Sequence, residues 1–425
     1  MTKVYIETYG CTLNQADSDI MKALLKEKGY TIVETEEESD AVVLNTCTVK
    51  GATESKIMSK IKVLTDQKKK LVVAGCLTVN EERIRKIAPQ ISIVGTASLK
   101  SIDAAVEAAL HDIPKTYRTF ESKDGLPKVI TIPIMRIPIN DGCTSSCNFC
   151  QTKLARPFLR SYSPKTIVTW INESVTKGAR EIQLTSMDSG AYGIDIKTNL
   201  ITLLKNIRED TSANKTTDTF FVRLGMINPN HAKRMLPELI HLLKHEKFYK
   251  FIHIPVQAGS ERVCREMNRD HGVTEFIEIV TTLRKEIPDI CISTDIIVGY
   301  PTETNEDYEE TKTLLNELNP DITNVSKFSP GPGTTAKKLK QLPSEEVKRR
   351  SKELSFLVKK ISEEVNKKLI GKTYTVLITE KDKHFKGRNE FYKQIVVPDF
   401  KGKLGEWVKV KIYDANYGSL FGRLA

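Results

Sequence analysis

Short apolar runs alternate with amphipathic stretches along the first 110 residues. The runs at 3–7, 41–44, 71–74 and 91–94 have the length of buried strands, and the stretches at 16–28, 52–64, 81–87 and 102–110 repeat apolar positions at helical spacing. Alternation of this kind predicts a parallel sheet covered by helices. We therefore expect a Rossmann-like parallel α/β domain over residues 1–112. No glycine-rich dinucleotide fingerprint follows the first run, so we do not expect a nicotinamide site.

A polar segment with Pro114, Gly125 and Pro127 follows and is typical of a linker. Over residues 128–360 we then count six strand-like runs, each followed by a polar loop and separated by helical stretches: 129–138, 181–185, 219–223, 251–255, 290–298 and 321–328. Six such units predict a partial (β/α)6 barrel, open on one side, with its binding loops at the carboxyl ends of the strands.

The last part of the chain has a different pattern. A charged helix is expected from residue 345 to about 369, followed by alternating or β-branched segments at 374–379, 392–397, 407–413 and 419–424. Glycines and lysines separate these segments. The pattern predicts a small antiparallel, OB-like β-barrel over residues 362–425.

Composition narrows the class of protein. The chain has 425 residues, of which 40% are hydrophobic and 28% charged, as in soluble globular proteins. It shows no apolar run long enough to cross a bilayer and no secretory signal, so we expect a cytoplasmic protein without a membrane partner. Eight cysteines in such a chain favour metal ligation over a disulfide scaffold.

The net charge of +11 is concentrated in one region. Residues 337–425 carry 22 Lys and Arg against 11 Asp and Glu, whereas residues 1–336 carry 43 of each. The basic excess indicates a polyanionic partner for the C-terminal region. A merely solvated helix face is the alternative.

Cys143, Cys147 and Cys150 form a C-x3-C-x2-C loop directly after the first strand of the central region. Structural zinc normally takes four ligands, and no fourth Cys or His lies nearby, since the next His downstream is His231. Three thiolates without a fourth protein ligand favour a [4Fe–4S] cluster with one open iron.

Three further cysteines follow successive strands of the N-terminal region. Cys11, Cys47 and Cys76 each come just after a predicted strand. Because the carboxyl ends of parallel strands share one edge of the sheet, we expect these thiols to converge, and we interpret them as ligands of a second [4Fe–4S] cluster. The alternative is three small buried cysteines, which is how we interpret Cys264 and Cys291.

The C-x3-C-x2-C loop closely resembles that of radical S-adenosylmethionine (SAM) enzymes, and the whole chain resembles the radical SAM methylthiotransferases with a C-terminal TRAM domain. The branch acting on N6-threonylcarbamoyladenosine (t6A) at position 37 of tRNA fits best, on the stretches 8–15, 45–49, 184–193, 225–229, 253–260 and 295–304. The sequence departs from the family pattern at Gly331, where Arg is common, and at Thr302, where Gly is usual.

The resemblance implies two [4Fe–4S] clusters and SAM as cofactors. It implies that the Cys143–Cys150 loop generates a 5′-deoxyadenosyl radical that removes the hydrogen at C2 of the base, while the N-terminal trio holds the methylated sulfur. Candidate SAM contacts, each with a structural role as alternative, are Phe149, Ser186, Asp188, Arg223 and Gln257. Candidate RNA contacts are Arg156, Arg160, Lys386, Arg388 and Lys393.

The implied partners are the anticodon loop of tRNA and an external flavodoxin- or ferredoxin-like electron donor, with an unidentified sulfur donor. Three alternatives stay open: methylthiolation of isopentenyladenosine-37, methylthiolation of a ribosomal protein aspartate, and a non-catalytic iron–sulfur protein that binds RNA or carries electrons. The basic C-terminal region argues against the ribosomal protein substrate.

Overall fold

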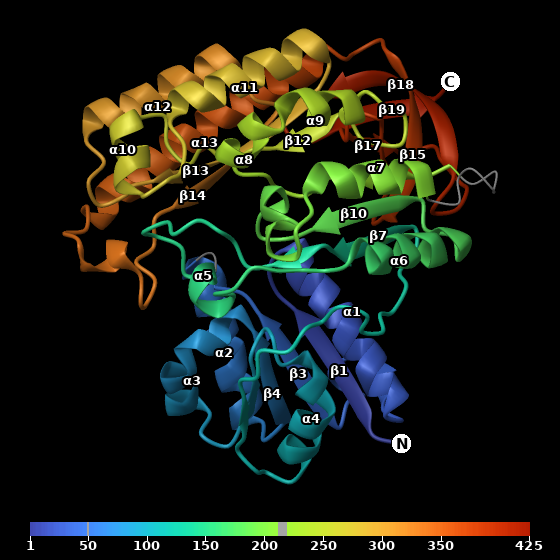
Figure 1. Cartoon of the computed structure of the whole chain (residues 1–425), viewed down its shortest axis with the longest axis vertical. Helices are drawn as coiled ribbons and strands as arrows, with labels where there is room; N and C mark the ends of the chain where they lie inside the picture. Colours follow the sequence, from blue (N-terminus) through green and yellow to red (C-terminus); the bar gives the residue numbers. More distant parts are fainter. Residues whose placement is uncertain (49–50, 211–218) are drawn as a thin grey trace.

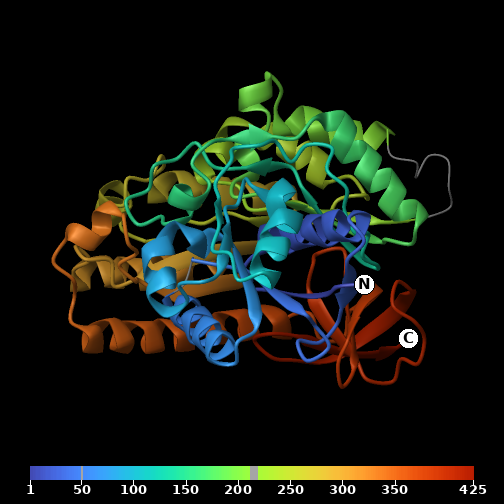
Figure 2. The same cartoon turned by 90° about the horizontal axis from the view of Figure 1, so that it is seen from below.

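A computed structural model describes residues 1–48, 51–210 and 219–425. Figure 1 shows the N-terminal α/β domain at the bottom, the central strands and helices above it, and the C-terminal barrel at the upper right. Seen from below in Figure 2, the N-terminal domain lies across the central region and the C-terminal barrel stands to one side. The predicted α/β, partial-barrel and small-barrel architecture is confirmed.

The N-terminal sheet is parallel throughout, with the order β2-β1-β3-β4-β5-β6. Its strands are β1 Lys3–Thr8, β2 Thr31–Val33, β3 Ala41–Thr46, β4 Lys70–Gly75, β5 Ser92–Val94 and β6 Thr116–Tyr117. Its helices are α1 Thr12–Glu27, α2 Gly51–Asp66, α3 Glu81–Ile87 and α4 Ile102–Leu110, with the 3-10 turn η1 Cys76–Asn80. The short edge strands β2 and β6 were not expected, and β6 extends the sheet into the predicted linker.

The described residues of the central region form six parallel strands in two groups of three, β7-β10-β11 and β12-β13-β14. A bridge between Val222 and Phe248 joins the groups into one curved wall. The strands are β7 Ile134–Pro138, β10 Glu181–Thr185, β11 Phe221–Arg223, β12 Phe251–His253, β13 Cys291–Val298 and β14 Ile322–Lys327, with a small pair formed by β8 Asn140–Asp141 and β9 Arg160–Ser161. This is the open six-strand arrangement that the sequence predicts.

Helices cover the outer side of this wall, where apolar side chains of alternate strand positions such as Ile182, Ile252 and Ile296 join one large core. The helices are α6 Pro164–Thr176, α7 Leu200–Asp210, α8 Pro229–Arg234, α9 Leu236–Leu243, α10 Glu261–Glu266, α11 Val273–Glu286 and α12 Asn305–Leu318. The short helix α5 Thr152–Ala155 instead lies against η1 of the N-terminal domain (Figure 1). Because strand side chains alternate, residues such as Gln183, Arg223 and Asp295 face the inner side of the wall.

The C-terminal barrel closes in the order β15-β16-β17-β19-β18. Its strands are β15 Thr373–Lys381, β16 Phe385–Arg388, β17 Gln394–Val397, β18 Trp407–Ala415 and β19 Leu420–Leu424, and the long helix α13 Ser344–Lys367 leads into it. The strand β16 was not expected, and β17 pairs with β19 in parallel rather than antiparallel orientation. The barrel encloses its own apolar core, which includes Val376, Ile395 and Val410.

Candidate active site

The turns after β1, β3 and β4 carry the N-terminal trio of cysteines. Cys11 precedes α1, Cys47 follows β3, and Cys76 opens η1. Gly10 has a φ of +103°, and a Cβ at this position would lie 2.8 Å from the Cys47 Sγ, so the first turn passes directly over Cys47. Burial raises the pKa of Cys76 to about 12, and the neighbouring Cys11 and Cys47 add to the rise. These contacts bring the three cysteines near one another, as the strand-end positions predict, and their role as cluster ligands stays a prediction.

Asn14 holds these turns together from the first helix. Its side-chain amide donates to the backbone carbonyls of Tyr9 at 3.0 Å and Thr46 at 2.8 Å. Its Oδ1 lies 3.7 Å from the Cys76 Sγ. The side chain is fully buried, so its hydrogen bonds are made at low dielectric, where they fix the turns firmly.

The C-x3-C-x2-C loop is surrounded by donors directed at its sulfurs. The backbone N–H of Ser145 lies 3.4 Å from the Cys143 Sγ, and the Asn228 amide lies 3.8 Å from the same atom. The Arg269 guanidinium lies 3.2 Å from the Cys147 Sγ. Burial raises the pKa of Cys143 to about 11 and also raises the pKa of Cys150.

None of the eight cysteines, all of which are described, is in a disulfide bond. In the described ranges no three His, Cys, Asp or Glu side chains converge closely enough to hold a single metal ion. The fit of a larger iron–sulfur cluster rests on the donor set. The C-x3-C-x2-C loop offers three soft thiol ligands with N–H groups and a cation around them, and such groups stabilise an anionic cluster.

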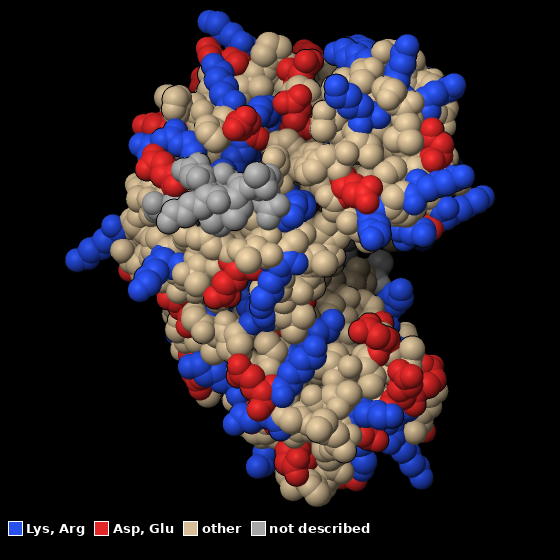
Figure 3. Space-filling model, turned by 90° about the vertical axis from the view of Figure 1, so that its right-hand side faces the viewer, with Lys and Arg blue, Asp and Glu red and all other residues tan. Residues whose placement is uncertain are grey.

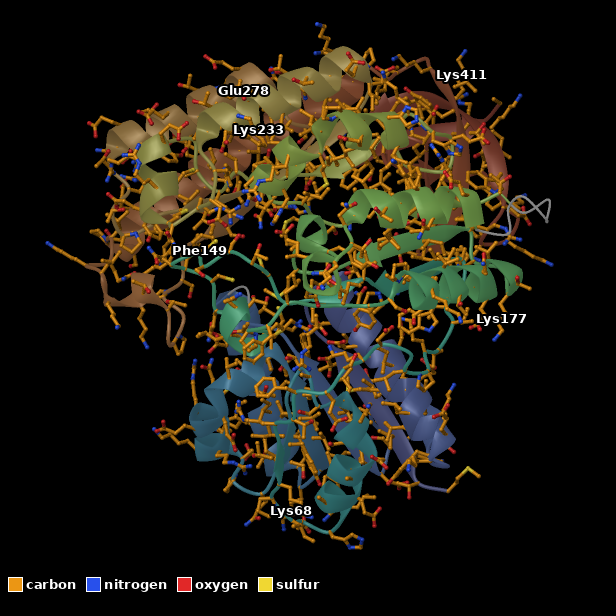
Figure 4. The ribbon with its side chains drawn as sticks, viewed as in Figure 1. Lys68, Phe149, Lys177, Lys233, Glu278 and Lys411 are labelled. Atoms are coloured by element: carbon orange, nitrogen blue, oxygen red, sulfur yellow. The ribbon has the colours of Figure 1, made fainter. Side chains whose placement is uncertain are left out.

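A cavity of about 640 Å³ lies between the two α/β units. The N-terminal domain contributes Thr48, next to Cys47, and the cysteine loop contributes Phe149 and Cys150. The inner face of the central wall contributes Gln257, Asp295, Asn324 and Phe328. Figure 4 shows Phe149 on the loop between the central helices and the N-terminal domain. The cavity thus borders both the C-x3-C-x2-C loop and the turn after β3, which carries Cys47.

The five candidate SAM contacts fall into different places. Phe149 and Gln257 line the cavity. Ser186 is bonded to the Ser189 hydroxyl at 2.9 Å. Asp188 is completely buried 3.9 Å from the Cys143 Sγ, where it accepts from the Asn228 amide at 2.7 Å, so it supports the loop from below.

Arg223 lies against aromatic rings of the central wall and of the C-terminal barrel. Its guanidinium lies 5.2 Å from the ring centroid of Phe251 and 5.8 Å from that of Tyr392 in the C-terminal barrel. The structure therefore groups Arg223 with the junction between the central wall and the C-terminal barrel.

Two of the five candidate RNA contacts are corrected by the structure. Arg156 is only 3% exposed, because Asp17, Asp141 and Asn14 surround its guanidinium. Lys393 is 7% exposed and forms an ion pair with Asp321 at 2.7 Å. Neither side chain is open to a phosphate, since each is needed to neutralise a buried carboxylate.

The other three candidates stay nearer the surface. Arg160 lies over the ring of the exposed Phe120, at 5.9 Å. Lys386 pairs with Asp382 at 2.5 Å, and Arg388 lies 4.5 Å from the centroid of Tyr392 and 3.3 Å from Glu380. Their contact with RNA stays a prediction.

Sequence reasoning missed Asn228 and Arg269 beside the cysteine loop and Asp17 beside Arg156. Asn228 and Arg269 follow the loop by more than 75 positions. Asp17 lies on an amphipathic helix, where a polar residue is expected on the exposed face and does not indicate a buried ion pair. The sequence position of Asn228 could have indicated it, since Asn228 lies in a loop after a strand, where ligand-binding residues of barrels gather.

The two departures from the family pattern lie in different surroundings. Gly331 lies against Gln151 in the cavity wall. The buried Thr302 hydroxyl has no hydrogen-bond partner within the described chain.

Many Lys and Arg side chains project from the surface of the C-terminal barrel, at the upper right of Figure 3. Exposed members on two neighbouring strands are Lys409, Lys411 and Arg423, and Lys411 pairs with Arg423 in register. The same view shows a hollow between this barrel and the N-terminal domain below it.

In the described part of the chain, no helix is long and apolar enough to cross a membrane.

Three known domain families match the chain in order. Residues 3–95 match an uncharacterized protein family, UPF0004, residues 137–315 match the radical SAM superfamily, and residues 367–425 match the TRAM domain. The superfamily match implies SAM and a [4Fe–4S] cluster as cofactors.

Solved structures with a similar fold include radical SAM enzymes. The methyltransferase TsrM from Kitasatospora setae gives a TM-score of 0.57 at 12% identity, over 79% of this chain and 74% of that one. The cobalamin-dependent enzyme OxsB gives 0.54 at 10% identity, over 85% and 56%. These likenesses concern the fold.

Sequence relatives are much nearer. A probable threonylcarbamoyladenosine tRNA methylthiotransferase of Pyrococcus horikoshii is 41% identical over the full length of both chains. The human threonylcarbamoyladenosine tRNA methylthiotransferase is 36% identical over 97% of this chain and 72% of its own length. The chain belongs to the family of the threonylcarbamoyladenosine tRNA methylthiotransferases, within the radical SAM superfamily.

Proposed function

We propose that this protein adds a methylthio group to C2 of N6-threonylcarbamoyladenosine at position 37 of tRNA. The observation that carries the proposal is the cavity of about 640 Å³ that borders both the C-x3-C-x2-C loop and the turn after β3. Relatives named for this activity match 97–100% of this chain, which supports the same substrate.

The chemistry requires a radical route. Carbon 2 of the base has no acidic proton and no leaving group, so general acid–base catalysis offers no path to it. A reduced [4Fe–4S] cluster with SAM bound supplies a 5′-deoxyadenosyl radical when both are present, and the rest of the protein positions the groups and excludes water.

Residues of this chain have distinct tasks in the proposal. Cys143, Cys147 and Cys150 would hold the SAM cluster, and Cys11, Cys47 and Cys76 a second [4Fe–4S] cluster that presents the sulfur. Arg269, 3.2 Å from the Cys147 Sγ, balances the negative charge of the first cluster. Phe149 and Gln257 line the cavity and are the candidates for contact with the adenosyl group or the target base.

The basic C-terminal barrel would bind the tRNA backbone, since phosphate neutralisation supplies most of the affinity for nucleic acid. A flavodoxin- or ferredoxin-like protein would donate electrons. The sulfur would come to the N-terminal cluster from an unidentified donor.

The test is a reconstitution assay. The iron-loaded protein, reduced under anaerobic conditions, is incubated with SAM and sulfide and with tRNA carrying threonylcarbamoyladenosine, tRNA carrying isopentenyladenosine, or ribosomal protein. We expect 5′-deoxyadenosine to be released and a methylthio group to be added only with the tRNA that carries threonylcarbamoyladenosine. Mass spectrometry of nucleosides and peptides measures both products. A product on isopentenyladenosine or aspartate would replace the proposed substrate, and no 5′-deoxyadenosine from any arm would overturn the radical mechanism.

A further inference from the structure

Four charged side chains form a buried network where the N-terminal and central domains meet. The Arg156 guanidinium pairs with Asp17 at 2.5 Å and with Asp141, and the Lys123 ammonium lies 2.8 Å from each of the same two carboxylates. Arg156 is 3% exposed, Lys123 4% and Asp17 1%. The network therefore pairs two cations with two carboxylates and has almost no access to solvent.

The members of this network come from both sides of the interface. Asp17 lies on α1 of the N-terminal domain, and Lys123 lies in the segment between the domains. Asp141 precedes Cys143 by two residues, and Arg156 follows Cys150 by six. The pair Arg156–Asp141 thus ties the two ends of the cysteine loop together, and the pair Arg156–Asp17 ties that loop to the N-terminal domain.

Arg156 also reaches the N-terminal trio of cysteines. Its Nη2 donates to the Asn14 Oδ1 at 3.0 Å, and the same oxygen lies 3.7 Å from the Cys76 Sγ. Arg156 thus follows the C-x3-C-x2-C loop in sequence and lies near Cys76 of the N-terminal trio in space.

We propose that Arg156 is the positioning residue that couples the two cysteine centres: it fixes the C-x3-C-x2-C loop against the N-terminal trio and supplies the positive charge that sets the reduction potential of the centre on Cys11, Cys47 and Cys76. The inference rests on the proposed second cluster. Nothing about Arg156 requires contact with SAM or tRNA.

Two physical reasons support this role. A buried cation beside an iron–sulfur centre stabilises the reduced, more negative state, so it raises the reduction potential. Replacing Arg156 by Met leaves Lys123 facing two carboxylates, which places one net negative charge near Cys76. The planar fork of Arg also bridges three acceptors at once, and a Lys side chain is too compact a donor to do the same.

The first experiment measures reduction potentials in the iron-loaded protein by titration followed with electron paramagnetic resonance. We expect Arg156→Met to shift the N-terminal centre to a more negative potential and to leave the centre on Cys143, Cys147 and Cys150 unchanged. Arg156→Lys keeps the charge and is expected to stay near the wild-type potential. The matched control is Arg160→Met. Arg160 lies four residues after Arg156, over the ring of Phe120 at the surface, so its replacement should leave the reduction potentials of both centres unchanged.

The second experiment measures how many 5′-deoxyadenosine molecules form per methylthio group on tRNA. A misplacement of about 1 Å costs on the order of 10²-fold in a positioned reaction, so both Arg156 variants are expected to cleave SAM while transferring far less sulfur. Arg156→Lys is the variant to use if Arg156→Met does not fold, which thermal unfolding of the metal-free protein decides.

The outcomes separate this inference from the proposed function. An unchanged N-terminal potential in Arg156→Met, or an equal shift in Arg160→Met, overturns the electrostatic role. Wild-type coupling in Arg156→Lys overturns the positioning role. A wild-type protein that carries two centres but modifies no tRNA would defeat the proposed function alone, because the potentials would still answer the question about Arg156.

Discussion

The Tyr392 hydroxyl of the C-terminal barrel lies 3.3 Å from the carboxylate of Glu181. Glu181 is the first residue of β10 and is completely buried. The same hydroxyl accepts from the Gln183 amide at 3.2 Å, and Tyr249 donates to the other oxygen of Glu181 at 2.9 Å. A loop of the C-terminal barrel thus completes the hydrogen bonds of a buried acid in the central wall.

Tyr392→Phe removes this hydroxyl and leaves Glu181 and Gln183 with fewer partners. Losing a bond to a buried polar group costs about 1–3 kcal/mol. We expect that loss in the free energy of unfolding, measured with urea on the metal-free protein. Tyr413→Phe, at an exposed position of the same barrel, should change it by less than about 0.5 kcal/mol. Equal effects of the two changes would contradict the role of Tyr392.

Gly10→Ala tests the turn over Cys47. The new Cβ would lie 2.7 Å from the Cys47 Cβ, in a backbone conformation with positive φ. Gly29→Ala is the matched control, because Gly29 also has a positive φ but no atom within 4 Å of the new Cβ. We expect Gly29→Ala to cost about 1–2 kcal/mol of stability with normal iron loading. Gly10→Ala should in addition lose about half of the bound iron, and normal loading there would contradict the cluster assignment.

Replacing Cys143, Cys147 and Cys150 together by Ala should remove one cluster and keep the other. Iron and sulfide analysis is expected to fall to half, and 5′-deoxyadenosine formation should stop. The complementary triple change at Cys11, Cys47 and Cys76 should also halve the iron but should preserve SAM cleavage. Cys264→Ala and Cys291→Ala, in the core, should leave the iron content unchanged.

His271 makes the fold sensitive to acid. Burial, reinforced by the charge of Arg269, lowers the pKa of His271 to about 4, and the Arg269 Nε donates to its Nε2 at 3.0 Å. The unfolded chain therefore binds a proton near pH 6.5 that the folded chain does not bind, so stability falls as the pH drops from about 6.5 to about 4.

The loss reaches up to about 3 kcal/mol, from the difference between the two pKa values. His271→Asn should remove this part of the pH dependence, measured by urea unfolding at pH 7.5 and pH 4.5. His111→Asn, at an exposed position, should leave it as in the wild type. A wild-type slope in His271→Asn would show that other groups cause it.

Lys409, Lys411 and Arg423 are expected to contact tRNA phosphates in place of the buried Lys393. If each neutralises one phosphate, changing all three to Ala should reduce the slope of log affinity against log salt concentration by about 2–3. Filter binding at several salt concentrations measures this slope. Lys68→Ala, at the far end of the N-terminal domain in Figure 4, is the control and should leave the slope unchanged.

The fold could be predicted from the sequence where a local pattern determines it. The strand–helix alternation and the strand-end positions of Cys11, Cys47 and Cys76 placed both sheets and the first trio correctly. Two-residue strands such as β6 carry too few side chains to show a period, and the parallel pairing of β17 with β19 depends on how the barrel closes, which no local pattern encodes.

The predictions for charged residues were weaker for a clear reason. Arg156 and Lys393 look like surface cations in the sequence, but each neutralises an acid that is more than 70 positions away along the chain, Asp17 and Asp321 respectively. A sequence shows a charge and not its partner. Long-range pairing of this kind could be recognised only once the domains were docked.

The network of Asp17, Lys123, Asp141 and Arg156 limits how the chain can be recombined. An N-terminal domain taken from another protein and joined at the linker would bring its own residue at position 17 to face Arg156 of the host. Without a carboxylate there, a buried pair would be broken, which costs about 3–5 kcal/mol. Exchange of domains between relatives should therefore succeed only when the donor brings a carboxylate to that position, and the two cysteine-bearing units are expected to be inherited as one piece.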